Sequence, residues 1–216
     1  MSKQTYVITE EQLQMQLGFC DKIAAYWNQE GIAPTAYVET YGCQQNVSDG
    51  ERIKGMLAEM GFGFTDTPDN ADLILFNTCA VRGHAEDRVL GNVGALKAIK
   101  QARPQTIIAL CGCMVQQEKA ANILNQKFKH IDMVFGTHSL YKFPEILYTA
   151  MKERVLDVID CDGYIAEDIP MKRDDKFRAW VSIMYGCNNF CSYCIVPYVR
   201  GRERSREPKA IIEDIR

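Results

Sequence analysis

Long apolar runs are missing from this sequence, and no segment is predicted to cross a bilayer as a helix. The opening residues, MSKQTYVITEEQLQ, have no apolar core behind a basic start, which argues against a secretory signal peptide. We therefore expect a cytoplasmic protein without a membrane partner. Low-complexity segments are also missing, so the 216 residues are expected to form one large or two small domains.

Histidine is scarce as well, with three in the chain, whereas cysteine is abundant, with nine. In a reducing cytoplasm disulfides are rare, and clustered cysteines usually bind metal or carry out redox chemistry. Cys20 and Cys161 lie outside any motif, and we interpret them as small buried apolar residues. Six of the other seven cysteines fall into two groups of three, and the seventh is Cys111.

The more compact group lies in YGCNNFCSYC, where Cys187, Cys191 and Cys194 have the spacing C-x3-C-x2-C. Three thiolates can hold three irons of a 4Fe–4S cluster and leave the fourth iron open for a substrate or cofactor. The alternative is zinc with a distant fourth ligand. None of the three histidines is near this stretch in the sequence, so an iron–sulfur cluster is favoured.

The chain upstream alternates short apolar runs with longer helical patterns. This pattern predicts an α/β fold, with a parallel sheet that has helices on both faces. The expected strands are residues 36–40, 73–77, 106–112 and 132–136, with a weaker one at 61–65. The expected helices are residues 9–29, 48–61, 85–102, 115–126 and 139–153.

Four segments are expected along the chain. Residues 1–35 would form a helical extension, and residues 36–154 the α/β domain. A linker containing one strand would follow at 155–176. A second unit at 177–216 would open with the apolar strand 179–186, which leads directly into the compact cysteine group.

The other cysteine group emerges from the predicted topology. Cys43, Cys79 and Cys113 each follow a predicted strand, and the carboxyl ends of parallel strands share one edge, where ligands bind. Helix N-termini after Cys43 and Cys79 would favour thiolates. The alternative is three unrelated buried cysteines, and we favour a metal site. Cys111 is expected to pack at the end of its strand rather than to bind metal.

The motifs also carry a family resemblance. The C-x3-C-x2-C spacing, with aromatic Tyr193 just before the last cysteine, resembles the radical S-adenosylmethionine superfamily. Over about 36–216 the chain resembles the methylthiotransferases, and NTCAVRGHAEDR most resembles the branch that acts on isopentenyladenosine beside the tRNA anticodon. The stretches that carry this resemblance are YGCQQNVSDGE, LFNTCAVRGHAEDRVLG, CGCM, DMVFGTHSL and PYVRGRERSRE.

The resemblance implies a set of cofactors and partners. Two 4Fe–4S clusters are implied, a radical-generating one and an auxiliary one that delivers sulfur. Tyr193 would lie on the adenine side of S-adenosylmethionine, and no acid or base side chain is assigned. The implied partners are isopentenylated tRNA, an electron donor and a sulfur donor. The radical cluster would be held by Cys187, Cys191 and Cys194, and the auxiliary cluster by Cys43, Cys79 and Cys113.

The resemblance also implies that residues 177–216 are the first strand, loop and helix of a (β/α) barrel that continues past residue 216. We therefore expect residues 1–216 alone not to complete catalysis. Other readings stay open: an iron–sulfur electron-transfer or cluster-carrier protein, or a methylthiotransferase for threonylcarbamoyladenosine or a ribosomal protein. The run RGRERSR (200–206) would also suit a zinc module that contacts nucleic-acid phosphates.

Overall fold

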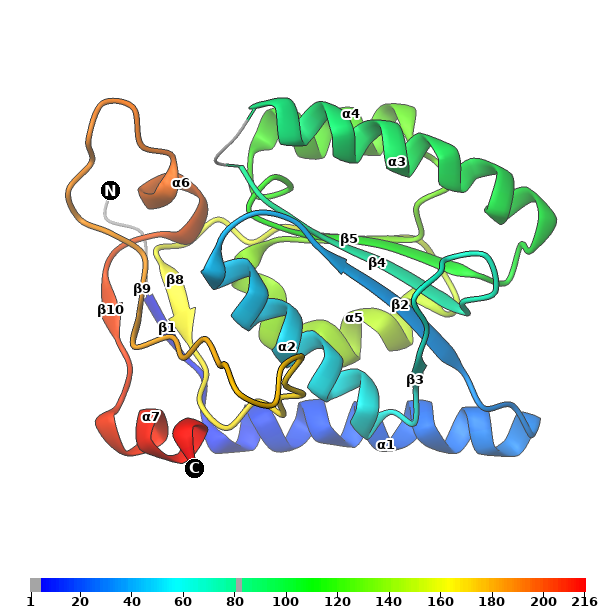
Figure 1. Ribbon diagram of the computed structural model, residues 1–216, viewed down its shortest axis with the longest axis horizontal. Helices are drawn as coiled ribbons and strands as arrows, with labels where there is room; N and C mark the ends of the chain where they lie inside the picture. Colours follow the sequence, from blue (N-terminus) through cyan, green and yellow to red (C-terminus); the bar gives the residue numbers. More distant parts are fainter. Residues whose placement is uncertain (1–4, 81–82) are drawn as a thin grey trace.

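A sheet of six parallel strands forms the centre of the protein (Figure 1). The computed structural model describes residues 5–80 and 83–216. The strand order is β3-β2-β4-β5-β6-β7, which confirms the predicted α/β class. The strands are β2 (Thr35–Thr40), β3 (Gly63–Phe64), β4 (Leu73–Thr78), β5 (Ile107–Gly112), β6 (Met133–Phe135) and β7 (Val155–Asp157).

Helices cover both faces of this sheet (Figure 1). One face carries α1 (Glu10–Glu30), α2 (Gln44–Glu59) and α5 (Phe143–Ala150), and the other carries α3 (Gly83–Ala102) and α4 (Glu118–Lys127). On β4, Leu73 and Leu75 belong to the first core and Ile74 and Phe76 to the second. Burial on both faces explains the uninterrupted apolar run in this strand. Among the described helices, none is long and apolar enough to span a bilayer.

Helix α1, predicted as an N-terminal helical extension, packs against the sheet. Thr9 begins the helix with a capping box that includes Gln12, and Gly31 ends it in the left-handed conformation. Cys20 and Ile23 on its inner side are buried in the same core as the sheet. The helix therefore closes one face of the sheet.

Several predicted boundaries shift for local reasons. Helix α2 begins at Gln44 rather than at 48, so its first turn directly follows Cys43. Helix α4 begins at Glu118 rather than at 115. The predicted helix 139–153 is instead a 3₁₀ segment, η1 (Thr137–Lys142), followed by α5. Pro144 in the first turn of α5 suits a helix start, because proline lacks the N–H that the first turn leaves unpaired.

The expected linker contains two strands rather than one. Strand β7 joins the main sheet beside β6, and β8 (Gly163–Ile165) pairs with β1 (Thr5–Val7). The predicted strand 179–186 shrinks to β9 (Met184–Tyr185), which pairs with β10 (Arg204–Ser205). The cysteine loop after β9 leads to the short helix α6 (Val196–Arg200), and the chain ends with α7 (Pro208–Ile215).

Ion pairs hold the C-terminal segment, residues 171–216, against the polar side of α2. Arg173 contacts Glu51 at 2.6 Å, and Arg52 of α2 lies 3.5 Å from Asp214 of α7. Arg206 lies 2.6 Å from Asp214 and is itself buried. Because paired charges tolerate burial, the C-terminal residues can pack closely against α2 although the contact is polar. It brings the compact cysteine loop to the same side of the molecule as the ends of β2, β4 and β5 (Figure 1).

Candidate metal centre

Three cysteines follow three neighbouring strands of the sheet, and we call Cys43, Cys79 and Cys113 the first cysteine site. Cys79 directly follows β4, Cys113 directly follows β5, and Cys43 comes three residues after the end of β2. Strands β2 and β4 lie side by side, and the helices that follow them, α2 and α3, cover opposite faces (Figure 1). Such a topological switch point opens a crevice at the carboxyl ends of the strands, where α/β proteins bind ligands.

Two glycines let these strand ends approach each other closely. Gly42 has φ +107°, and a Cβ built on it would lie 2.3 Å from Cβ of Cys79 and 2.5 Å from its Sγ. Gly112 has φ +98°, and its Cβ would lie 2.3 Å from the carbonyl oxygen of Thr78. Both positions need glycine because of the backbone conformation and the lack of space.

The thiols of this group converge around one side chain, Asn46. Sγ of Cys43 lies 3.6 Å from Oδ1 of Asn46, and the thiol of Cys113 donates a hydrogen bond to the same oxygen at 3.7 Å. The Cys43 and Cys79 side chains are hydrogen-bonded to each other. Cys79 and Cys113 are buried and Cys43 is partly exposed. The structure therefore brings together residues that are distant in the sequence.

The surroundings shift the pKa values of the Cys43 and Cys113 thiols in opposite directions. The hydrogen bond with Cys79 lowers the pKa of Cys43 to about 5 against the opposing effect of burial, and the charge of Arg200 adds to the lowering. Burial raises the pKa of Cys113, although Arg200 opposes this effect. Because thiolates bind metal, Cys43 is already in its ligating form near neutral pH.

Asn46, Asp49 and Arg200 are site residues that the sequence did not reveal. Asn46 is fully buried on the first turn of α2, and its Nδ2 donates to the carbonyl oxygen of Thr78 at 2.8 Å. Arg200 reaches the site from α6. A usable signal existed for Asn46 and Asp49, because the first turns of α2 read QQNVSD and offer little apolar surface. Polar side chains that face inward at a strand end suggest a site.

The remaining cysteines of the main domain are packed. Cys111 lies in the core that includes α1, and burial raises its pKa well above the usual value. Residues 111 and 113 would share a face of a regular strand, but the positive φ of Gly112 turns the chain between them. Cys20 and Cys161 are also buried, with 2% and 4% of their surface exposed.

The compact group lies in the loop between β9 and α6 and is more open. Cys191 is exposed, and Cys187 and Cys194 are partly exposed. The amide of Cys194 donates to the carbonyl oxygen of Cys191 at 2.9 Å, which closes a turn. Tyr193, in the same turn, is 90% exposed. The loop thus presents its cysteines and this aromatic ring toward the outside of the molecule.

Neither group is arranged around a single ion. Among the described residues, no three His, Cys, Asp or Glu side chains are close enough to share one metal ion. Ligands of a cubane cluster bind different iron atoms at its corners and lie further apart than the ligands of one ion. The donor set, three thiols at each place, suits iron–sulfur chemistry.

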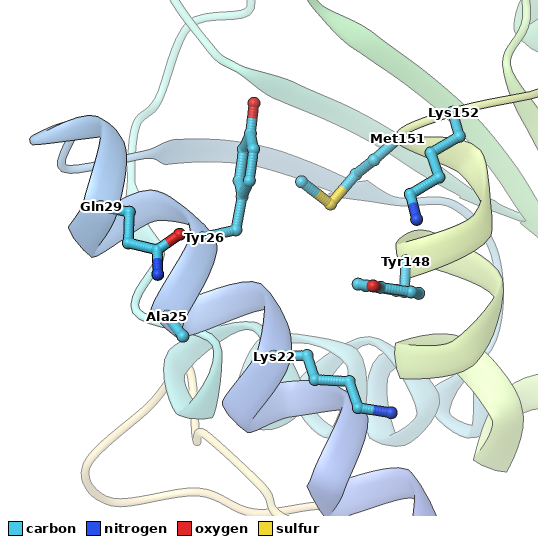
Figure 2. Close-up of a pocket in the computed structure, with 7 residues that line it drawn as sticks. All are labelled: Lys22, Ala25, Tyr26, Gln29, Tyr148, Met151 and Lys152. Carbon is cyan, nitrogen blue, oxygen red and sulfur yellow. The ribbon is translucent and has the colours of Figure 1, made fainter.

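A surface pocket of about 440 Å³ lies elsewhere, between α1 and α5 (Figure 2). Figure 2 shows Lys22 and Tyr26 of α1 facing Tyr148 of α5 and Lys152 from the turn after it. The ammonium group of Lys152 lies 4.7 Å from the ring centre of Tyr148. No cysteine lines this pocket, and the candidate chemistry lies at the carboxyl edge of the sheet.

Comparisons with known proteins cover both cysteine groups. The family described as "Uncharacterized protein family UPF0004" matches residues 35–136, which include Cys43, Cys79 and Cys113. A tRNA-2-methylthio-N(6)-dimethylallyladenosine synthase of Acetivibrio thermocellus is 49% identical over 99% of this chain and 46% of its own length. Proteins of the same name from Caldicellulosiruptor saccharolyticus and Clostridioides difficile are 53% and 45% identical, over 88% and 100% of this chain.

The chain is homologous to tRNA methylthiotransferases over nearly its whole length. It spans less than half the length of these curated methylthiotransferases, 46% of the first and 41% and 47% of the other two. The aligned part of the Clostridioides difficile methylthiotransferase covers both cysteine groups, because it extends over 100% of this chain.

Proposed function

We propose that this chain is part of a radical S-adenosylmethionine enzyme that adds a methylthio group to the adenine of N6-isopentenyladenosine beside the anticodon of tRNA. The observation that carries the proposal is the convergence of the Cys43 and Cys113 sulfurs on one oxygen of Asn46, with the Cys79 side chain hydrogen-bonded to that of Cys43. The names of the related enzymes support the choice of substrate.

The two cysteine groups would hold two 4Fe–4S clusters. Cys43, Cys79 and Cys113 fit the auxiliary cluster, since three thiols meet at a strand-end crevice without a fourth cysteine ligand. Cys187, Cys191 and Cys194 would hold the other cluster together with S-adenosylmethionine. When bound, these groups supply the radical and the sulfur chemistry that side chains lack.

The protein side chains hold and orient these groups. Asn46 lies against the sulfurs of Cys43 and Cys113, and its Nδ2 links α2 to the end of β4. The exposed loop around Cys191 leaves room for the cofactor and the substrate base, and the exposed ring of Tyr193 is available to the adenine of S-adenosylmethionine. The partners would be isopentenylated tRNA, an electron donor and a sulfur donor, all in the cytoplasm.

The proposed domain organisation assigns each cluster to its own unit. Residues 36–154 would form the auxiliary-cluster domain, and residues 177–216 would begin the radical barrel. Helix α1 packs on the first of these domains through Cys20 and Ile23, and residues 155–176 would connect the two.

A zinc-dependent nucleic-acid module is a weaker candidate. It relied on the arginines of RGRERSR to contact phosphates. Arg200, Arg204 and Arg206 are instead buried, with at most 9% of their surface exposed, and contact protein groups. Arg202 has 55% of its side chain exposed and lies 4.0 Å from Asp162, so it is the most exposed of these four arginines. One arginine supplies little of the electrostatic attraction that non-specific binding requires.

Activity can be tested in a chimera. The aligned segment of the Acetivibrio thermocellus relative is replaced by this chain and expressed in a bacterium that lacks its own methylthiotransferase. We expect mass spectrometry of the tRNA nucleosides to detect the methylthio derivative of isopentenyladenosine. A chimera with Cys43→Ala is the matched control and should leave isopentenyladenosine unmodified.

Two outcomes would contradict the proposal. Unmodified isopentenyladenosine, with methylthio groups on threonylcarbamoyladenosine instead, would mean that the substrate is wrong. An active Cys43→Ala chimera would mean that this cysteine group is not needed for sulfur insertion. Iron and acid-labile sulfide in the reconstituted chain test the clusters separately, because a cluster carrier would bind iron without modifying tRNA.

A further inference from the structure

The arginine run after the compact cysteine loop faces inward. Arg200 and Arg204 are 9% and 8% exposed, whereas the side chain of Arg202 between them is 55% exposed. The carbonyl oxygen of Arg200 accepts hydrogen bonds from Nη1 and Nη2 of Arg204, both at 3.1 Å. The turn is therefore held from inside, and the side chain of Arg200 is directed away from solvent.

The guanidinium of Arg200 lies in the first cysteine site. Its Nε donates a hydrogen bond to Sγ of Cys113 at 3.1 Å. Its Nη2 donates to Oδ1 of Asn46 at 2.9 Å and lies 2.7 Å from Oδ2 of Asp49. A planar fork of donors can satisfy a sulfur, an amide and a carboxylate together, which a lysine ammonium matches poorly.

The next residue contacts the other cysteine group. The carbonyl oxygen of Gly201 accepts a hydrogen bond from the amide of Cys187 at 3.2 Å. Two consecutive residues thus bond to one cysteine of each group, through the side chain of Arg200 and through the backbone of Gly201. The turn is anchored from below by Thr137, whose hydroxyl donates to the carbonyl oxygen of Val199 at 2.6 Å.

We propose that Arg200 is a positioning residue that sets the placement of the two cysteine groups and raises the reduction potential of a cluster held by Cys43, Cys79 and Cys113. The claim about the reduction potential rests on the proposed function. A hydrogen bond and a positive charge at a ligating sulfur stabilise the reduced, more negative cluster. Asp49 holds the guanidinium in orientation and offsets part of its charge.

The test uses the chain with Cys187, Cys191 and Cys194 replaced by alanine, so that only the first site can hold a cluster. Arg200→Gln, Arg200→Lys and Arg202→Gln are introduced into it. Arg202→Gln is the matched control because it removes the same charge two residues away. The reduction potential is measured by a redox titration monitored by electron paramagnetic resonance.

We expect Arg200→Gln to lower the equilibrium constant for reduction of the cluster at least tenfold. For one electron this corresponds to a reduction potential that is lower by about 59 mV. Arg200→Lys should fall between the parent and Arg200→Gln, and Arg202→Gln should match the parent. If Arg200→Gln folds but binds no iron while Arg202→Gln does, the positioning role is supported. The effect on the reduction potential is then measured in Arg200→Lys. Equal potentials for Arg200→Gln and Arg202→Gln would overturn the redox part.

A second measurement does not depend on iron. Amide hydrogen exchange at Cys187 is followed in the iron-free chain with native cysteines. We expect faster exchange in Arg200→Gln than in Arg202→Gln, because the turn that holds this amide loses the anchor that the Arg200 side chain provides. Equal exchange would overturn the positioning role. A parent chain that binds no iron would contradict the proposed function, while this exchange measurement would still decide whether Arg200 positions the turn.

Discussion

The amide of Cys113 donates a hydrogen bond to the carbonyl oxygen of Thr78 at 2.9 Å, and Thr78 is the residue before Cys79. This single backbone contact joins two cysteines that are 34 positions apart in the sequence. It extends the pairing of β4 with β5 by one residue past the last paired positions, Thr78 and Gly112. The parallel sheet itself thus delivers both side chains to one edge.

Each cysteine group should hold its own cluster. Replacing Cys187, Cys191 and Cys194 together by alanine should remove one cluster and leave the other, because the first group is complete without them. The measurement is iron and acid-labile sulfide per chain after anaerobic reconstitution. A triple variant that loses all of its iron, or none, would show that the assignment to two groups is wrong.

Cys113 and Cys111 should behave differently although they are two residues apart. Cys113→Ala should lower the iron content of the first site. Cys111→Ala should keep the iron and lower the free energy of unfolding by about 1 kcal/mol, since it leaves a small cavity in the core. Iron analysis and thermal unfolding separate the two effects, and equal iron loss in both variants would count against the ligand choice.

Gly112 should be intolerant of a side chain. Gly112→Ala requires a positive φ and brings Cβ against the Thr78 carbonyl, so we expect at least about 1 kcal/mol of destabilisation and less iron. Gly91→Ala is the control, because the added Cβ meets nothing within 4 Å. It lies within α3 and should be neutral or stabilise the protein by up to about 1 kcal/mol. Equal unfolding temperatures for the two variants would contradict the crowding at Gly112.

Thiol reactivity in the iron-free chain should follow the electrostatics. The hydrogen bond from Cys79 lowers the pKa of Cys43 to about 5, whereas burial and nearby carboxylates raise the pKa of Cys20 to about 12. Iodoacetamide should therefore alkylate Cys43 well before Cys20 at pH 7. The Cys43 rate should change little between pH 7 and 8, because the thiolate is already formed. Peptide mass spectrometry gives both rates, and a rise of about tenfold over that interval would contradict the lowered pKa.

Arg206 should matter for stability more than an exposed arginine does. Its side chain is 1% exposed and lies 2.6 Å from both Glu167 and Asp214. Arg206→Gln leaves Glu167 without its cation and leaves Asp214 with only the longer pair to Arg52. We expect a loss of about 3 kcal/mol in the free energy of unfolding. Arg216→Gln breaks an exposed pair with Glu213 and should change little. Denaturant unfolding compares the two variants, and equal midpoints would contradict the role of the buried network.

The strands were predictable because their signal is local. LILFN and TIIALCG are continuous apolar runs, and such runs reflect burial on both faces of a parallel sheet. The meeting of Cys43 and Cys113 followed from the same pattern, since residues after parallel strands share an edge. The structure adds their common partner, the Oδ1 of Asn46.

The sequence alone determined the α/β class and the two cysteine groups, because periodicity, turn residues and motif spacing are local properties. Only the tertiary structure decided that α1 closes the sheet and that Arg200 bonds to Cys113, 87 positions away. An arginine in a polar run looks the same whether it faces solvent or sulfur. Its partner depends on how the C-terminal segment docks against α2, and that docking arises from many weak contacts between distant residues that leave no pattern in the local sequence.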